Sequence, residues 1–554
     1  METSFFAKLK PNKLKKILLL VSSAYQAYSS LKRDLPDFLR QAKSDPSSTR
    51  RILVASTGCF DAKSEAIYAG ALGSAGFTPY IIAHWDPFVA KIFSLFAIRD
   101  VHFYNSYYRR FPLRKYVKRT KSALKEVAPD TMLNFVEKGI CVGKYAASSF
   151  MRITRQSNLN LGNPKMRSLF AECLCRSFRA ADIANAIIDE LKPTLLFVND
   201  RGYTPEGQLF DACLNRGVDI IQRCGSHKGG FEILKRYRDS SMSQIHHHSL
   251  SDESWDFLRK IPWNEACWQQ LFEEVKNTYI SGEWFSEVGT QFNKKIYSKE
   301  ELCRKLGLSP DKKTAVVFPH IFWDATFFWG KDLFNDYYDW FVNVLKVAKE
   351  NTNLNWVIKI HPANIVKARR DNYRGQHKEL TAVYEVLGEL PSHIKVIEPE
   401  TDINTFSLFS ITDYCLTVRG TIGIEAAMLG ITTLTAGTGR YDGLGFTHDF
   451  QDRQSYLDCL KNLEKLPAMN PQEIELARRF AYGIFILRPI HLDILEHGYE
   501  QDERATMRFK LLFSTQPEYE NSQFVKKFRE FVLSDKEDFL DLERIPDNKA
   551  LCVE

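Results

Sequence analysis

Polar and glycine residues gather directly after three apolar runs in the second half of the chain. The run 356–360 is followed by His361, the run 414–418 by Arg419, and the run 432–436 by Gly437. Each run has the composition of a strand, with β-branched and apolar residues prominent. Because ligands bind beyond the carboxyl ends of parallel strands, these loops are expected to converge on one ligand site.

The residue types in these loops suit a nucleotide mono- or diphosphate ester. Small residues let the backbone approach phosphate, and a helix expected from Ile424 would direct its first N–H groups toward it. Arg419 or His361 would neutralise charge on a departing phosphate. Glu425 would accept hydrogen bonds from ribose hydroxyls, or would simply favour the helix dipole. The candidate donor-binding residues are Lys359, His361, Arg419, Gly420, Thr421, Gly423, Glu425, Gly437, Thr438, Gly439, Arg440 and Tyr441.

Strand ends in the first half of the chain offer candidates for a catalytic base. Asp61 follows the run 51–56, Asp200 follows 194–198, and His227 follows 218–223. Transfer to a hydroxyl acceptor needs a carboxylate or imidazole that takes the hydroxyl proton. The sequence does not decide which of the three is the base, because Asp61 also suits the N-cap of a helix and Asp200 also suits a turn. His320 and Asp324, after the run 314–318, are expected at a cleft between the two halves.

Three adjacent histidines, His246, His247 and His248, raise the question of a metal site. Side chains of consecutive residues on a regular element cannot all face one ion, and no cysteine or carboxylate cluster flanks them at ligand spacing. The sequence also has no D-x-D pair, no P-loop and no dinucleotide fingerprint. We therefore expect no metal ion and no cofactor.

The length of 554 residues exceeds one ordinary core and predicts several domains. Apolar runs alternate with helical stretches from about 46 to 290, which predicts one α/β domain, and again from 291 to 480, which predicts a second. A basic amphipathic segment is expected at 1–45 and a helical extension at 481–554. With 44% hydrophobic and 26% charged residues, the composition excludes a disordered chain and a coiled-coil rod.

The net charge is +7, and part of the excess is clustered. Basic residues lie between Arg109 and Lys125 with no acid before Glu126, which fits either a solvated helix or a surface for anionic lipid. No motif typical of nucleic-acid recognition accompanies these basic residues, so nucleic acid is not an expected partner. The eleven cysteines form no C-x-x-C pair, which is typical of reduced thiols in a cytosol. We expect a cytoplasmic protein, with contact to the inner face of the cell membrane as a further option.

The three loops of the second half together resemble the bacterial capsule-polysaccharide synthesis family, which includes transferases for the keto-sugar acid Kdo. The similar blocks are WVIKIHP at 356–362, TVRGTIGIE at 417–425 and AGTGRYDG at 436–443. The resemblance implies a GT-B-like fold, with two Rossmann-type α/β domains that face a cleft. It also implies a donor-phosphate contact for His361 and a phosphate and ribose loop from Gly420 to Glu425. Related enzymes often carry paired serines in this loop, where this chain has Arg419-Gly420-Thr421. The resemblance therefore does not determine the identity of the donor.

With this resemblance, the sequence predicts a metal-independent glycosyltransferase. Its second domain would bind a nucleotide-sugar donor, with a CMP-linked sugar as one option, and its first domain a surface-polysaccharide or lipid-linked acceptor. The alternatives are a sugar-nucleotide epimerase or polyol-phosphate transferase of the same fold, or a non-catalytic protein of polysaccharide assembly. Inversion or retention at the transferred sugar is left open.

Overall fold

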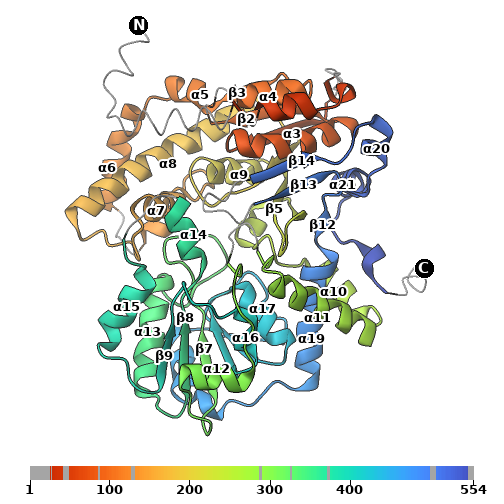
Figure 1. Cartoon of the computed structure of the whole chain (residues 1–554). Helices are drawn as coiled ribbons and strands as arrows, with labels where there is room; N and C mark the ends of the chain where they lie inside the picture. The colour runs from red at the N-terminus through yellow and green to blue at the C-terminus, as the bar shows by residue number, and fades with distance from the viewer. Residues whose placement is uncertain are drawn as a thin grey trace.

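The computed structural model describes residues 25–26, 28–40, 49–84, 86, 88–126, 131–285, 290–324, 327–370, 375–499 and 507–546. These residues form two α/β domains, each built on its own sheet, one above the other in Figure 1. The predicted fold class of two Rossmann-type α/β domains is therefore confirmed. The expected basic segment at 1–45 lies largely outside the described residues. No helix within the described ranges has the length and apolarity that a membrane span requires.

The first domain is organised around a seven-stranded sheet in the order β12-β6-β5-β4-β1-β2-β3. Strands β3, β2, β1, β4 and β5 pair in parallel, and β6 and β12 extend one edge in antiparallel pairing. Leu53 and Ala55 of β1 contribute to one core, and Ile52 and Val54 to the other, because side chains alternate along a strand. Burial on both faces explains why this run is continuously apolar. The bounds are β1 (Arg51–Ser56), β2 (Thr78–Ala83), β3 (Val101–Phe103), β4 (Leu195–Val198), β5 (Asp219–Gly225), β6 (Phe231–Tyr237) and β12 (Ile490–His491).

Helices cover both faces of this sheet. The core that contains Leu53 includes α7 (Val142–Thr154), α8 (Pro164–Leu191) and α9 (Glu206–Asn215), and the opposite core includes α3 (Cys59–Ser74) and α4 (Val89–Leu95). Two shorter helices, α5 (Tyr104–Arg110) and α6 (Val117–Glu126), follow β3, and α6 packs on α8. Helix α8 begins after Asn163, whose side chain accepts hydrogen bonds from two backbone N–H groups of the first turn.

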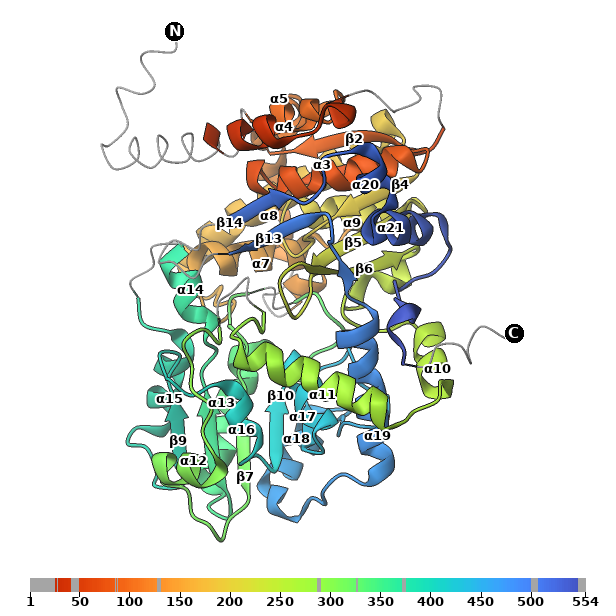
Figure 2. The same cartoon turned by 45° about the vertical axis from the view of Figure 1, so that its right-hand side comes forward.

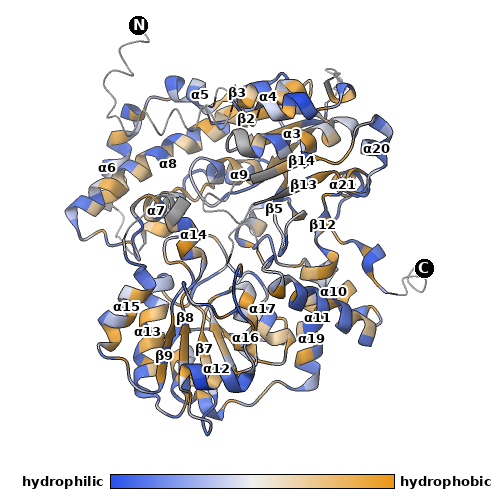
Figure 3. Cartoon of the chain, in the orientation of Figure 1, coloured by the Kyte–Doolittle hydropathy of each residue, from blue (hydrophilic) through white to orange (hydrophobic). Residues whose placement is uncertain are grey.

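The second domain contains a five-stranded, fully parallel sheet in the order β11-β10-β7-β8-β9. Figure 3 shows its strands as largely hydrophobic, as expected for strands that are covered on both faces. The strands are β7 (Thr314–Val317), β8 (Asn355–Lys359), β9 (Ile394–Ile397), β10 (Tyr414–Thr417) and β11 (Thr432–Thr435). One core includes α13 (Tyr337–Glu350), α15 (Lys378–Leu387) and α18 (Arg453–Lys461). The other includes α12 (Lys299–Leu306), α16 (Thr405–Phe409), α17 (Thr421–Met428) and α19 (Pro471–Tyr482).

Two helices that the sequence assigned to the first domain pack on the second. They are α10 (Asp252–Lys260) and α11 (Glu265–Ile280). Leu271, Val275 and Tyr279 of α11 recur every four residues and form one apolar stripe. This stripe is buried in the same core as Met428 and Phe480. The expected domain boundary at 290 is therefore wrong, because the chain enters the second domain soon after β6.

The prediction of a separate helical extension at 481–554 is also wrong. After a π-helical turn, Gly483–Leu487, the chain returns to the first domain, where β12 pairs with β6. A hairpin of β13 (Leu495–Tyr499) and β14 (Met507–Leu511) precedes α20 (Gln516–Asn521) and α21 (Gln523–Leu533). Phe524 and Phe528 of α21 pack on Tyr68 of α3, at ring-centroid distances of 5.1 and 4.9 Å. Figure 2 shows α20 and α21 beside α3, so this segment completes the core of the first domain.

Candidate functional site

Loops that follow the strands of the two sheets meet between the domains, in a region that we call the interdomain seam. Backbone hydrogen bonds across this seam join the two domains directly. The N–H of His246 donates to the carbonyl of Gly439 at 2.9 Å, and the N–H of Gly330 donates to the carbonyl of Gln244 at 2.9 Å. The second-domain loops of the seam follow β7, β10 and β11, which is where a ligand site is expected in a parallel sheet.

Asp324 lies at this seam and holds groups from both domains. The Tyr203 hydroxyl donates to its Oδ1 at 2.9 Å, and Nη1 of Arg152 lies 3.2 Å from the same oxygen. Lys367 of α14 (Ala363–Arg370) forms an ion pair with Oδ2. Burial raises the pKa of Asp324, but the charges and hydrogen bonds of Lys367 and Arg152 outweigh it and keep that pKa below its usual value. Asp324 thus joins the two domains.

His320 and His361 are partly exposed and uncharged at neutral pH. Burial and nearby cations hold the pKa of His320 well below its usual value and lower that of His361 to about 3. The ring of His320 stacks on Tyr337 at a centroid distance of 4.4 Å. Nδ1 of His361 accepts the backbone N–H of Ala363 at 3.2 Å. The ring proton of His361 therefore lies on Nε2, which can donate it to a ligand.

Arg419 is buried and crosslinks two loops of the second domain. Its Nε donates to the carbonyl of Thr438 at 2.9 Å, and its Nη2 donates to the carbonyl of Lys331 at 3.1 Å and pairs with Asp332. A Cβ at Gly437 would lie 2.3 Å from this Nη2, so Gly437 makes room for the guanidinium. Nη1 has no hydrogen bond within the described part of the chain. Arg419 is 3% exposed, so it serves mainly to hold these loops together.

Gly423 makes room for a protein side chain. The hydroxyl of Tyr441 donates to the carbonyl of Gly420 at 2.8 Å, and a Cβ at Gly423 would lie 2.2 Å from that hydroxyl. Gly420 is the N-cap of α17, and Gly420 and Thr421 are both partly exposed. Helix α17 thus begins at Thr421, three residues before the expected Ile424, and the small size of Gly423 is used by Tyr441.

Arg440 is a partly buried cation at the seam. Its Nη1 donates to the carbonyl of Arg419 at 3.1 Å, and its Nη2 lies 2.9 Å from Nδ1 of His248. Burial lowers the pKa of Arg440 to about 10, so the guanidinium remains charged at neutral pH. Its Nε is buried without a hydrogen bond, and no carboxylate pairs with it among the described residues. An enclosed cation without a counter-charge favours a bound anion.

Glu425 and Lys359 are only 1% and 3% exposed. Tyr279 of α11 donates its hydroxyl proton to Glu425, and burial raises the pKa of Glu425 to about 7. Lys359 donates to the carbonyl of Ile360 at 3.1 Å, and burial together with the charge of Lys294 lowers its pKa to about 7. Because both side chains are buried, the structure does not favour the ligand contacts that the sequence predicts for Glu425 and Lys359.

Two of the three base candidates remain accessible. Asp61 lies on the first turn of α3, is partly exposed and accepts the hydroxyl proton of Thr57. Asp200 is exposed and accepts the backbone N–H of Gly202 at 2.7 Å. Desolvation by the surrounding protein raises the pKa of Asp200, and the charge of Glu206 adds to this effect.

His227, the third candidate, is buried beneath α11. Its Nε2 lies 2.7 Å from Oε1 of Glu274, and Nζ of Lys228 lies 2.6 Å from the same oxygen. The ring packs on Trp284 at a centroid distance of 5.4 Å, and the side chain is 1% exposed. Burial lowers the pKa of His227. Because the ring is buried and its Nε2 is engaged by Glu274, His227 is poorly placed to take a proton from an acceptor.

The fold brings the run of histidines close to Cys224. One potential ligand atom from each of Cys224, His247 and His248 lies within 4.8 Å of the others. However, His248 already contacts Arg440 through Nδ1, and its ring also hydrogen-bonds the backbone of Gly225. Burial and four neighbouring cations lower the pKa of His247 well below its usual value. The ligand types suit zinc, but the positive charge around them and the hydrogen bonds that His248 already makes disfavour a divalent metal ion.

The sequence analysis missed His84 and Glu206. His84 directly follows β2, and Glu206 lies on the first turn of α9. Their side chains contact each other, with Nε2 of the histidine 2.7 Å from Oε1 of the glutamate. The rule that selected Asp61 and Asp200, a polar residue just after a strand, also selects His84. Only the folded structure, which brings Glu206 against His84, could have identified this glutamate as a candidate.

No protein-family model and no curated protein matches the sequence. Among solved structures, the chain is similar to two KpsC β-Kdo transferases of Thermosulfurimonas dismutans. The 2,4 transferase has 14% identity and a TM-score of 0.33, over 54% of this chain and 82% of that one. The 2,7 transferase has 12% identity and a TM-score of 0.33, over 58% and 85%. Kdo transferases, which the sequence resembles in its loops, are thus among the similar solved structures.

The chain is also similar to the UDP-GlcNAc 2-epimerase of Neisseria meningitidis, whose structure is bound to UDP-GlcNAc. The identity is 13% and the TM-score 0.27, over 78% of this chain and 96% of the epimerase.

Proposed function

We propose that the chain is a metal-independent glycosyltransferase that moves a sugar from a nucleotide-sugar donor to a polysaccharide or glycolipid hydroxyl. The observation that carries this proposal is Arg440, a charged guanidinium that lacks a carboxylate partner among the described residues and contacts the loop before α17. Nε2 of His361 and the first N–H groups of α17 add further donors in the same group of loops. These groups suit the oxygens of a phosphate ester.

The proposed chemistry follows from this charge distribution. When an acceptor oxygen bonds to the anomeric carbon, the bond between that carbon and the donor phosphate oxygen breaks, and the electron pair leaves with the phosphate. Positive charge and hydrogen-bond donors at the leaving oxygen stabilise this step most strongly in an enclosed site. A guanidinium group and a helix N-terminus supply such charge, so the proposal includes no metal ion.

The first test is nucleotide binding. Thermal unfolding is measured with CMP, UDP, GDP, dTDP and CDP compounds, because a ligand that binds only the native state raises Tm by mass action. Arg440→Gln should weaken binding of the effective nucleotide by about 10- to 100-fold, since a hydrogen bond to a charged group contributes about 1.5–3 kcal/mol. Arg304→Gln, an exposed residue of α12, is the matched control. If no nucleotide raises Tm, the proposal is wrong.

The second test is product analysis by mass spectrometry, with the nucleotide-sugar that binds and a set of hydroxyl acceptors. A glycosyltransferase adds the sugar mass to the acceptor and releases the nucleotide. An epimer formed without an acceptor would identify an epimerase, and phosphorus in the product a phosphotransferase. Binding without turnover of any donor would identify a non-catalytic protein. Each of these three results contradicts the proposal.

A further inference from the structure

A histidine and a glutamate form a pair at the carboxyl edge of the first sheet, apart from the loops assigned to the donor. His84 follows the last residue of β2, and Glu206 is the first residue of α9. Nε2 of His84 lies 2.7 Å from Oε1 of Glu206, and the side chains are 41% and 12% exposed. The imidazole is therefore accessible to a ligand, while the carboxylate behind it is mostly enclosed by protein.

The second ring nitrogen of His84 is available to a ligand. In the described part of the chain, the hydrogen bond of this ring is the one from Nε2 to Glu206. A carboxylate holds the ring proton on the nitrogen that it contacts, which leaves Nδ1 of the neutral imidazole as a proton acceptor. The ring also lies against buried Tyr104, at a centroid distance of 5.1 Å. Glu206 and Tyr104 thus orient the ring from two elements.

Ionisable groups near the pair come from three elements: Glu206 from α9, Tyr104 from α5, and Asp200 from the loop after β4. Burial lowers the pKa of His84, but the hydrogen bond and charge of Glu206 outweigh it and raise that pKa. The charges of Glu206 and Asp324 both raise the pKa of Asp200. Asp200 is thus coupled electrostatically both to Glu206 of the pair and to Asp324 at the interdomain seam.

The other polar groups that follow strands of this domain are less suited to take a proton. Asp61 already accepts the hydroxyl proton of Thr57, and Asp200 accepts a backbone N–H. His227 is 1% exposed, and its Nε2 is engaged by Glu274. His84 combines an accessible imidazole with a carboxylate behind it, the arrangement in which a histidine acts as a general base.

We propose that His84 is the catalytic base that activates the acceptor hydroxyl, with Glu206 as its positioning residue; this inference rests on the proposed function. Nδ1 of His84 takes the hydroxyl proton while the acceptor oxygen bonds to the anomeric carbon of the donor. The bond from that carbon to the phosphate oxygen breaks, and its electron pair leaves with the nucleotide. Glu206 stabilises the imidazolium through Nε2–H, and the proton on Nδ1 then passes to water.

The test compares His84→Ala and His84→Gln with His102→Ala. His102 is a suitable control because it is a partly exposed histidine of the same domain, on β3, with its ring near Tyr80. We expect both His84 variants to lose about 10²- to 10⁴-fold in kcat, while the rise in Tm with nucleotide is unchanged. The control should keep wild-type turnover. Added imidazole should restore part of the activity of His84→Ala, which a purely structural role would not produce.

The pH profile tests Glu206. Because the base works in its deprotonated form, kcat should rise with pH through the pKa of His84. Glu206→Gln removes the charge that raises this pKa, so the acidic limb should move to lower pH, and kcat on the plateau should fall. An unchanged limb overturns the positioning role of Glu206.

The outcomes separate the two proposals. If the wild-type protein transfers sugar and His84→Ala does so within roughly threefold of the wild-type kcat, the base role is overturned and the proposed function stands. If the wild-type protein transfers no sugar from any donor, both are overturned.

Discussion

Tyr203 donates its hydroxyl proton to Oδ1 of Asp324 at 2.9 Å, although the two residues belong to different domains. Arg152 and Lys367 pair with the same carboxylate from opposite sides of the seam. Hydrogen bonds to an ionised group are stronger than neutral ones. One aspartate thus joins the loop after β4, helix α7 and helix α14, and holds together the loops that carry the candidate site.

Asp324→Asn should weaken this junction. The replacement leaves the charges of Arg152 and Lys367 without their shared partner, and we expect a loss of about 1–3 kcal/mol in the free energy of unfolding in urea. Asp458→Asn is the control, because its pair with Lys461 is about half exposed and such pairs contribute little to stability. Equal effects of the two replacements would show that Asp324 does not stabilise the seam.

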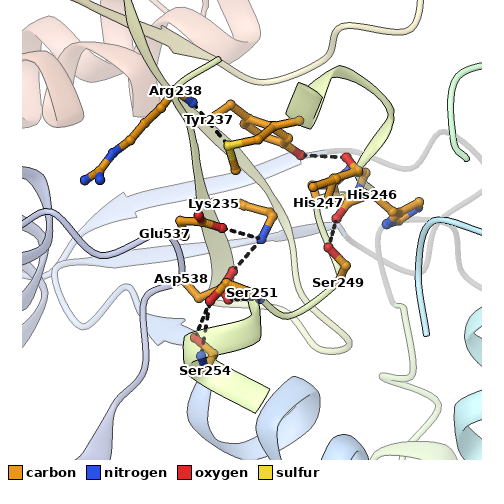
Figure 4. Close-up of polar contacts among 12 residues, drawn as sticks. Lys235, Tyr237, Arg238, His246, His247, Ser249, Ser251, Ser254, Glu537 and Asp538 are labelled. Atoms are coloured by element: carbon orange, nitrogen blue, oxygen red, sulfur yellow. Dashed lines mark hydrogen bonds and ion pairs between the residues drawn. The ribbon is translucent and has the colours of Figure 1, made fainter. Parts of the chain in front are cut away.

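Asp538→Ala should strongly destabilise the protein. Figure 4 shows Asp538 against Lys235 and Ser251: Nζ of Lys235 lies 2.9 Å from Oδ1, and the N–H of Ser251 donates to Oδ2 at 2.7 Å. Arg488 is the second cation, at 3.4 Å, and the side chains of Lys235, Arg488 and Asp538 are all 0% exposed. Loss of the acid leaves Arg488 without an ion-pair partner among the described residues and Lys235 with Glu537 alone, at 4.0 Å, which costs about 3–5 kcal/mol. Chemical denaturation checks this, and an effect no larger than that of exposed Asp535→Ala would contradict it.

Glu65 should make the protein less stable as the pH rises. Its side chain is 1% exposed, and its oxygens have no hydrogen-bond partner among the described residues. Burial raises its pKa from 4.5 to about 8, although Arg223 lies 3.7 Å away. Because the folded state keeps the proton to higher pH than the unfolded state, this contribution to stability is complete below pH 4.5 and is lost progressively up to about pH 8.

Glu65→Gln removes this titration. Between about pH 5 and pH 8 the wild type should lose stability relative to the variant by at most about 1.4 kcal/mol per pH unit, as measured by chemical denaturation. Glu300→Gln, an exposed residue of α12, should retain the wild-type dependence. If the difference between wild type and Glu65→Gln is the same at both ends of this range, the buried acid does not hold its proton.

The basic cluster before and on α6 predicts binding to anionic membranes. Arg114, Lys115, Lys118 and Lys121 are exposed and form no ion pair in the part of the chain that the structure describes. Since each basic residue near an anionic surface contributes about 1 kcal/mol, the double variant Lys118→Glu/Lys121→Glu should lose most binding to phosphatidylglycerol vesicles. Cosedimentation measures this, with phosphatidylcholine vesicles as the control. Equal binding of wild type and variant would mean that this helix is merely solvated.

The sequence by itself determined the two α/β domains and the loops that end their strands. Runs such as 51–56 and 356–360 are apolar over consecutive residues, because strands of parallel sheets are buried on both faces. This signal is local, so it needs no knowledge of distant segments. For the same reason the sequence placed His361, Arg419 and Arg440 directly after strands, where the structure has them.

The tertiary structure decided which domain the flanking segments join. The apolar stripe of α11 marks a buried face without saying which sheet covers it, and the core around Met428 supplies the answer. Ile490 is likewise part of a short apolar stretch, and only the pairing of β12 with β6 makes it an edge strand of the first sheet. Such contacts join residues far apart in the chain, and they form only when both partners are already folded.

The tertiary structure also decided what each candidate residue touches. The sequence placed Glu425 on the helix after the 414–418 strand, but only the fold brings Tyr279 of another helix against its buried carboxyl group. His84 and Glu206 lie far apart in the chain and meet because β2 ends beside the start of α9. Composition and periodicity report the exposure and local conformation of a residue, whereas its partner, its charge state and hence its chemistry depend on how distant elements pack.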